Sequence, residues 1–300
     1  MQKSVEVSGD TQRYIRSFEH IGEVTALAQQ SLRAKDSNDR SSQNSGSEFS
    51  GTHNLEEAID LLQFGWPEGM AAARDLLSKI DLDEMTQQFQ ERFTQTTYYD
   101  LAGDEADVGR YLDGDPESMR NIVVVPQKVG SIVKILINLS QHYNVSADRM
   151  RRRGVVALGA VEALHRLGYS VDLHGYELST PSGDSASSTK YEAYIPLLSP
   201  GSITNLDTIS FAIAHPSFLR RIIFAVEEEE PEEIRDLFGF HSSEGYGIPH
   251  DLKPSQYKDP NVIHIGKDEA LCKKDKDMPK ELKRLLDKLF SQQAKLESAR

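Results

Sequence analysis

The sequence predicts an α/β protein with a doubly wound, mostly parallel Rossmann-like sheet, preceded by an acidic helical region. Residues 132–137 form an apolar run of strand length, interrupted only by Lys134, which is typical of a strand covered on both faces. The next segment has small and apolar residues at helical spacing, between a cap at Asn144 or Ser146 and Gly168. Residues 171–176 then predict a second strand, and such a strand–helix–strand unit favours parallel pairing.

The charge of the chain is concentrated in one block. The net charge is −13, and residues 51–120 carry 16 acidic but only 5 basic side chains. This block would repel a phosphate backbone, which makes nucleic acid an unlikely partner and suits a basic protein surface. The single cysteine, Cys272, excludes an intramolecular disulfide, and no apolar run approaches membrane-spanning length. We therefore expect a cytoplasmic protein without a membrane partner.

Composition divides the chain into four expected segments. Residues 1–32 should form an N-terminal helical arm with a helix over 11–32, and the polar residues 33–53 a flexible linker. Residues 54–120 should form the acidic helical region, with two helices on either side of a break at Trp66 and Pro67. Trp66 is expected to plug the core there. Residues 121–300 should form the α/β domain.

Within the expected acidic region, residues 98–119 interleave acids and glycines. They lack the ligand spacing of a calcium-binding loop, so an acidic, turn-rich surface is the better interpretation.

The α/β domain should contain further strands after the first unit. Apolar, β-branched segments predict strands at 121–129, 191–198, 220–226 and 262–265, and a last amphipathic helix at 279–296. The strand expected at 220–226 runs directly into the acidic run Glu227–Glu230.

This order of elements resembles a von Willebrand factor A (VWA) domain, whose ligands bind at the carboxyl ends of parallel strands. The resemblance rests on Asn138-Leu-Ser140-Gln-His142 in place of the family's D-x-S-x-S loop, on Thr204 as its later threonine, and on Glu227 or Glu228 as its later acid. It implies a partner-binding crevice formed by Asn138, Ser140, His142, Thr204 and Glu227. It also implies Mg²⁺ ligands at Ser140, Thr204 and Glu227, although Asn138 and His142 depart from the motif and weaken such a site.

A second resemblance covers more of the chain. The segments Gly65-Trp-Pro-Glu-Gly, Asp107-Val-Gly-Arg-Tyr-Leu and Gly114-Asp-Pro-Glu-Ser-Met are similar to an uncharacterised family of tailed-bacteriophage proteins. This resemblance implies a phage origin and, with it, the host-cell cytoplasm. It implies no activity.

Three functions are compatible with these residues. No nucleophile-elbow, phosphate-loop, dinucleotide or zinc-protease motif occurs, which favours a non-enzymatic adaptor that binds a phage or host protein through the crevice. A metal-dependent hydrolase would use His142, Asp172 and His174. A nucleic-acid-binding regulator would use the cluster Arg149–Arg153, with phosphate contacts from Arg149, Arg152 and Arg153, although such a cluster is more often a solvated or acid-paired helix side.

Overall fold

The computed structural model describes residues 1–8, 11–34, 39–82, 93–103, 105–126, 132–182, 189–201, 205–241, 245–253 and 262–298. The chain divides into two compact units: a body, Met1–Ile80 with Ile132–Arg300, and a hairpin unit, Asp81–Ser131. This division differs from the four expected segments, because the first 80 residues belong to the same unit as the α/β region.

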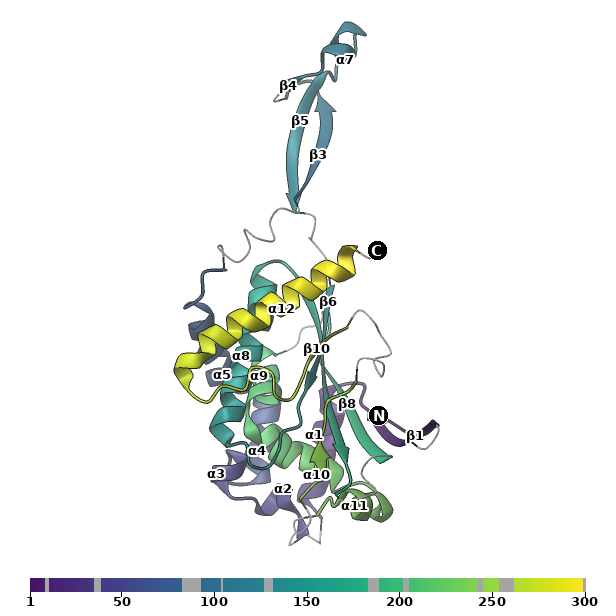
Figure 1. Ribbon diagram of the computed structural model, residues 1–300, viewed down its shortest axis with the longest axis vertical. Helices are drawn as coiled ribbons and strands as arrows, with labels where there is room; N and C mark the ends of the chain where they lie inside the picture. The colour runs from purple at the N-terminus through teal and green to yellow at the C-terminus, as the bar shows by residue number, and fades with distance from the viewer. Residues whose placement is uncertain are drawn as a thin grey trace. The chain divides into compact units, whose positions relative to one another are not determined.

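A mixed seven-stranded sheet forms the centre of the body (Figure 1). Its main path has the order β1-β2-β8-β7-β6-β10, and β9 pairs with β7. The bounds are β1 Gln2–Ser8, β2 Thr11–Ser17, β6 Ile132–Asn138, β7 Ser170–Thr180, β8 Thr189–Leu198, β9 Ile248–Pro249 and β10 Val262–Ile265. Strand β6 is parallel to β7 and β10, whereas β8 is antiparallel to β7. The predicted α/β class is confirmed, with parallel pairing centred on β6.

The strand–helix–strand unit expected from the sequence is confirmed as β6, α8 (Ala147–Arg166) and β7. Ser146 caps the helix, because its Oγ accepts a hydrogen bond from Arg149 N. Gly168 has a φ of +81°, the left-handed conformation that follows many helices. Gly154 brings α8 against the next helix layer, since a Cβ there would lie 2.1 Å from Ala214 Cα.

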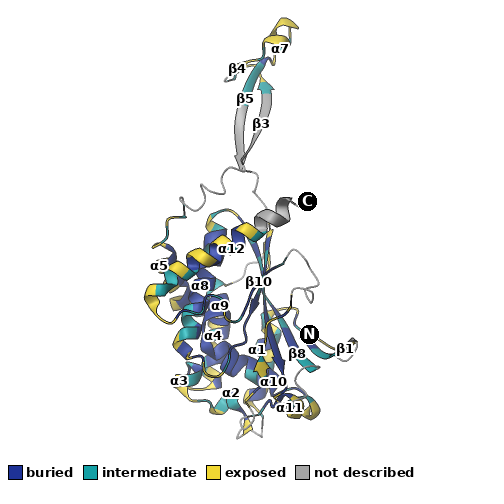
Figure 2. Ribbon diagram, in the orientation of Figure 1, coloured by how far each residue is buried: buried dark blue, intermediate teal, exposed yellow. Residues whose placement is uncertain are grey.

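The helices of the body surround α8. Helices α4, α5, α8 and α9 lie together on one side of the sheet (Figure 1), and α8 is largely buried (Figure 2). The other bounds are α1 Ile21–Leu32, α2 Ser41–Asn44, α3 Ser47–Ser50, α4 Leu55–Phe64, α5 Pro67–Leu77, α9 Leu206–Ala214, α10 Phe224–Glu227, α11 Glu232–Phe238, η5 Asp275–Asp277 and α12 Met278–Ser298. The predicted last helix is confirmed, Asn54 caps α4 by accepting a hydrogen bond from Glu57 N, and Trp66 is half-buried with its ring edge against His215.

Two secondary-structure predictions were wrong. The helix expected at 11–32 begins only at Ile21, because Thr11–Ser17 pairs with β8 as strand β2. The strand expected at 220–226 is helical: Phe218–Ile223 forms a π-helical segment, η3, that continues into α10. Apart from Arg220 and Arg221, which are themselves buried, this segment is apolar, and periodicity does not distinguish a buried helix from a buried strand.

The flexible linker expected at 33–53 is also wrong for its described residues. Arg221 is fully buried and donates hydrogen bonds to the carbonyl oxygens of Ser42, Ser45 and Thr52 at 2.7–2.9 Å. Glu228 accepts a hydrogen bond from Ser42 N at 2.9 Å. Residues elsewhere in the sequence therefore satisfy the backbone of a segment that has little apolar surface of its own.

The hairpin unit is built on a separate three-stranded sheet. Strand β5 (Met119–Pro126) pairs antiparallel with β3 (Phe93–Asp100) and with β4 (Glu105–Ala106), so the strand predicted at 121–129 does not join the main sheet. A short helix, α7 (Val108–Leu112), follows β4 and is capped by Asp107. The region expected to be helical at 54–120 therefore contains the strands β3, β4 and part of β5 as well as the helices α4, α5 and α7.

Among the described residues, no single helix is long and apolar enough to cross a membrane. Only the pair Leu206–Ala214 and Phe218–Glu227, taken together across an 80° bend, reaches that length and composition.

Candidate functional site

The loop after β6 is held at the carboxyl edge of the sheet by its own polar side chains. Asn138 is fully buried, and its Nδ2 donates to His250 O at 2.8 Å and to Asp251 Oδ1 at 2.7 Å. Asn138 Oδ1 accepts from Ser140 N at 2.8 Å, and Ser140 Oγ accepts from Leu178 N at 3.0 Å. Asn138 therefore holds the loop in place, and Ser140 is the first of the polar side chains along this edge of the sheet.

Strand β7 brings a second set of polar side chains to the same edge. Side chains alternate along a strand, so Tyr176 and Leu178 face Leu252 while Glu177 and Ser179 face the other way. Both Glu177 and Ser179 are buried. Because β6 and β7 are parallel, these residues lie near the loop that begins at Leu139.

Glu227 reaches this edge from the last turn of α10 rather than from a strand end. The acidic run that contains it is not the solvated helix start that such runs usually form. Glu228 accepts hydrogen bonds from Ser42 and from Tyr246 Oη, and Glu230 accepts from Arg16 Nη1 at 2.5 Å and Tyr191 Oη at 2.9 Å. Glu227 differs from them in having a carboxyl oxygen without such a donor.

These elements enclose a cavity of about 140 Å³. The residues that line it come from the loop after β6, from β7, from η3 and α10, and from the segments around residues 41–49 and 245–249: Ser41, Phe49, Ser140, Gln141, His142, Tyr143, Glu177, Ser179, Leu219, Arg220, Phe224, Glu227, Gly245, Tyr246, Gly247 and Pro249. Tyr143 and Gly245 are exposed, so the cavity opens to solvent on that side. Three predicted crevice residues, Ser140, His142 and Glu227, therefore share one cavity.

Several buried polar atoms of the cavity lining have no hydrogen-bond partner among the described residues. They are Glu227 Oε2, His142 Nδ1, Glu177 Oε2 and Ser179 Oγ; the last two lie near each other, since the Ser179 hydroxyl acts to lower the pKa of Glu177. Glu177 is 3% and Glu227 2% exposed, so both carboxyl groups are buried. A buried polar atom without a partner costs free energy, and its retention in a cavity indicates a place for a bound donor.

Burial changes the protonation of both carboxyl groups. It raises the pKa of Glu177 to about 8. Burial also raises the pKa of Glu227 well above its usual range, and the nearby charges of Glu177, Glu228 and Glu230 act in the same direction. Both carboxyl groups are therefore more easily protonated than an exposed glutamate.

Arg220 is the cationic residue of the lining, but its guanidinium is directed at backbone oxygens. It donates to Phe49 O at 2.7 Å and to Val145 O, and it stacks on the Phe49 ring at 3.8 Å. Burial lowers the pKa of Arg220 to about 10. Arg220 therefore shapes one wall without neutralising the two carboxyl groups.

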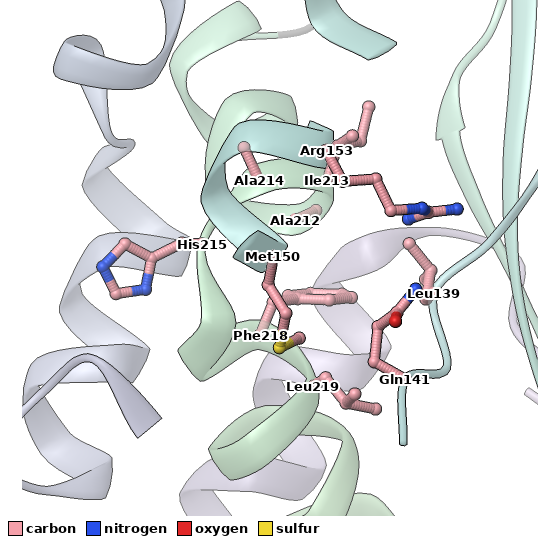
Figure 3. A pocket seen from close by; sticks show the side chains of 10 residues that line it. All are labelled: Leu139, Gln141, Met150, Arg153, Ala212, Ile213, Ala214, His215, Phe218 and Leu219. Carbon is pink, nitrogen blue, oxygen red and sulfur yellow. The ribbon is translucent and has the colours of Figure 1, made fainter. Parts of the chain in front are cut away.

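A smaller cavity of about 20 Å³ shares Gln141 and Leu219 with the first (Figure 3). It is lined mainly by apolar side chains of α8, α9 and η3, with Arg153 and His215 at its margin. Burial lowers the pKa of His215 to about 3, so this side chain is neutral at physiological pH. A volume of this size holds about one water molecule, which makes it a packing feature.

The Mg²⁺ site predicted at Ser140, Thr204 and Glu227 stays a prediction, because Thr204 lies outside the described residues. Ser140 and Glu227 line the same cavity, and Ser140 Oγ accepts a hydrogen bond from Leu178 N. No group of three or more His, Cys, Asp or Glu side chains in the described ranges is arranged to hold a metal ion.

The residues expected for the two alternative functions are not gathered into sites. Asp172 and His174 share a face of β7, as expected, with 3.1 Å between Oδ1 and Nε2, but neither lines the cavity that contains His142.

The arginine cluster is similarly divided. Arg152 pairs with Asp275, and Arg153 donates to Asn138 O at 2.8 Å and Gly266 O at 2.9 Å. Arg149 Nε is buried without a partner among the described residues. Arg152 and Arg153 thus both bond to other residues of the body.

Sequence reasoning missed Glu177, Ser179 and the mouth residue Tyr143. The available signal was Glu177 itself, since an acid among apolar and aromatic strand residues is unusual in a strand covered on both faces. Tyr143 carried no such signal, because its role depends on the loop geometry.

The fold and the cavity together define a mixed α/β protein with a polar cavity at the carboxyl ends of parallel strands. The chain belongs to the family described as "Domain of unknown function (DUF7192)", which matches residues 3–290. No curated protein and no solved structure matches the chain.

Proposed function

We propose that the chain is a non-enzymatic recognition protein that binds a protein partner through the strand-end cavity. The observation that carries this proposal is the set of buried acceptor atoms without partners around one opening, above all Glu177 Oε2 and Glu227 Oε2. Tyr143 supports it, because its side chain is 75% exposed at the mouth and contacts His142 with ring centroids 4.6 Å apart. Exposed aromatic residues beside a pocket are common anchors in protein interfaces.

The proposal retains part of the resemblance to a VWA domain. Ser140, His142 and Glu227 line the cavity, which supports a VWA-like use of the strand ends without requiring a bound metal ion. A phage origin and a role in the host-cell cytoplasm belong to the same proposal, and the motifs around residues 65–69 and 107–119 support them.

A capture experiment with two matched variants tests this function. Tyr143 and Tyr111 are both exposed, at 75% and 69%, but Tyr111 belongs to the hairpin unit. The full chain and its Tyr143→Ala and Tyr111→Ala variants would be used to capture partners from producing cells, with quantitative mass spectrometry. We expect Tyr143→Ala to lose a partner that Tyr111→Ala retains.

Equal recovery by all three proteins would exclude the cavity mouth as the recognition site. Loss with Tyr111→Ala alone would contradict the proposal and move recognition to the hairpin unit.

A further inference from the structure

The unpartnered atoms of the cavity define the kind of group that it takes. Two are carboxyl oxygens and one is a serine hydroxyl, so most of them accept hydrogen bonds. We propose that the cavity binds a guanidinium or ammonium group, which enters past Tyr143 and contacts Glu177 and Glu227. This inference rests on the proposed function, because it names the chemical group that the partner presents.

The size of the cavity agrees with such a group. Its volume is about 140 Å³. A protein cavity of about 150 Å³ accommodates benzene, a molecule of six heavy atoms. A guanidinium has four heavy atoms and the butylammonium group of a lysine side chain has five, so either fits. The lining also offers the exposed aromatic ring of Tyr143, and aromatic faces attract cations.

The electrostatic surroundings favour a cation over an anion. Glu228 and Glu230 lie near Glu227, and both act on it as negative charges, opposed by Arg16. Arg220 donates to carbonyl oxygens of Phe49 and Val145, which leaves the carboxyl pair without a positive partner from that wall. An anion would meet these acids directly, whereas a guanidinium supplies up to five donors.

Binding of the cation is coupled to loss of protons. Burial raises the pKa of both Glu177 and Glu227, to about 8 for Glu177, and so favours their protonated forms. An entering cation stabilises the carboxylate form, so each carboxyl group that ionises releases one proton to the solvent. The affinity should therefore rise by up to about tenfold per pH unit for each released proton, at pH values below the pKa of Glu177.

The test uses the full chain and an isosteric pair of probes. N-acetyl-arginine amide carries the guanidinium, and N-acetyl-citrulline amide replaces it with a neutral urea of nearly the same shape. Titration would be followed by calorimetry and by the ¹³Cδ NMR signals of glutamate carboxyl groups, which report ionisation. We expect arginine amide to bind with a shift of two buried glutamate signals, and Glu177→Gln and Glu227→Gln each to weaken binding by about tenfold or more.

Glu232→Gln is the matched control, because Glu232 lies five residues after Glu227 in the same acidic segment but is exposed and does not line the cavity. Its affinity should stay within about twofold of the parent. A short arginine-containing peptide forms a further arm. If the amide and the peptide bind with similar affinity, a free guanidinium compound is sufficient for binding. If only the peptide binds, the guanidinium that the cavity recognises is that of a protein side chain.

Equal binding of the citrulline and arginine probes would overturn the cationic assignment while leaving recognition by the cavity intact. Absence of binding by the amide and the peptide would also overturn it, even where capture depends on Tyr143. Conversely, the titration could show guanidinium binding while the capture experiment finds no partner that depends on Tyr143. The cation site would then stand, and the proposed recognition of a protein partner would be wrong.

Discussion

The body and the hairpin unit differ in what they bury. In the body, the charged side chains Arg16, Arg220 and Arg221 are among the largest that are fully buried. In the hairpin unit, by contrast, large apolar side chains are exposed: Leu101, Val108, Tyr111 and Leu112. Burial in the body therefore follows local demand for hydrogen-bond donors, and not hydropathy alone.

The largest expected effect comes from removing a buried charge of the body. Arg221→Ala would leave the carbonyl oxygens of Ser42, Ser45 and Thr52 without their donor. Each buried carbonyl without a partner costs about 1–3 kcal/mol, so we expect the free energy of unfolding to fall by more than about 3 kcal/mol in urea denaturation.

Arg284→Ala is the control for Arg221→Ala, because Arg284 is exposed and pairs only with Glu281 three residues away. It should change the free energy of unfolding by less than about 0.5 kcal/mol. If Arg221→Ala lowered the free energy of unfolding as little as Arg284→Ala does, the buried arginine would not be what orders residues 39–53. The claim that the body depends on its buried charged side chains would then be wrong.

The second effect concerns the pH dependence of stability. The pKa of Glu177 is raised in the folded state to about 8, so the folded protein binds this proton more tightly than the unfolded chain. The stabilisation is present at acidic pH and declines as the pH rises from the unfolded pKa, about 4.3, through the folded pKa, by up to about 1.4 kcal/mol per pH unit. Glu177→Gln should flatten this decline.

Urea denaturation between about pH 5 and pH 8 measures the effect of Glu177→Gln. The other charged groups around Glu177 are Glu192 and Glu227, and Glu227 in turn lies near Glu228, Glu230 and Arg16. Because burial also raises the pKa of Glu227, part of the decline in stability with pH should remain in the variant. Asp75→Asn, at an exposed ion pair with Lys79, should leave the slope unchanged. An identical slope in the parent and in Glu177→Gln would show that this carboxyl does not take up a proton on folding.

The smallest effect is expected in the hairpin unit. Leu112 is 77% exposed, so Leu112→Ser removes little buried apolar surface and should change the free energy of unfolding by less than about 0.5 kcal/mol. The buried Leu164 of α8 provides the contrast, because Leu164→Ala should cost about 2–5 kcal/mol. A large loss with Leu112→Ser in the same denaturation assay would mean that this apolar side chain is buried after all.

The predictable part of the fold was local. Residues 132–177 carry their own strand, cap and turn signals, and Ser146 and Gly168 act as their positions indicate. The interpretation failed where distant residues decide the structure. Residues 39–53 were expected to be flexible from their composition, but Arg221 satisfies their backbone. The segment at 220–226 had no exposed polar face to reveal a helical period, because Arg220 and Arg221 are themselves buried.

The candidate site shows the same limit. Ser140, His142 and Glu227 were placed together from the order of elements, although Glu227 arrives on a helix. Glu177 was not expected, because its neighbours are strand residues and only the pairing of β7 directs it into the cavity. Asn138 was assigned to the crevice, but its amide bonds to His250 and Asp251 and holds the loop instead.

The pairing of β2 with β8 has a consequence for biosynthesis. Gln12–Ser17 align with Thr189–Tyr194, and Arg16 pairs with Glu230, 214 residues later in the chain. During translation, strand β2 can pair with β8 only after most of the polypeptide has left the ribosome. Contacts between such distant positions slow folding, so nascent chains with an unpaired first hairpin should be the species most exposed to chaperones and to aggregation.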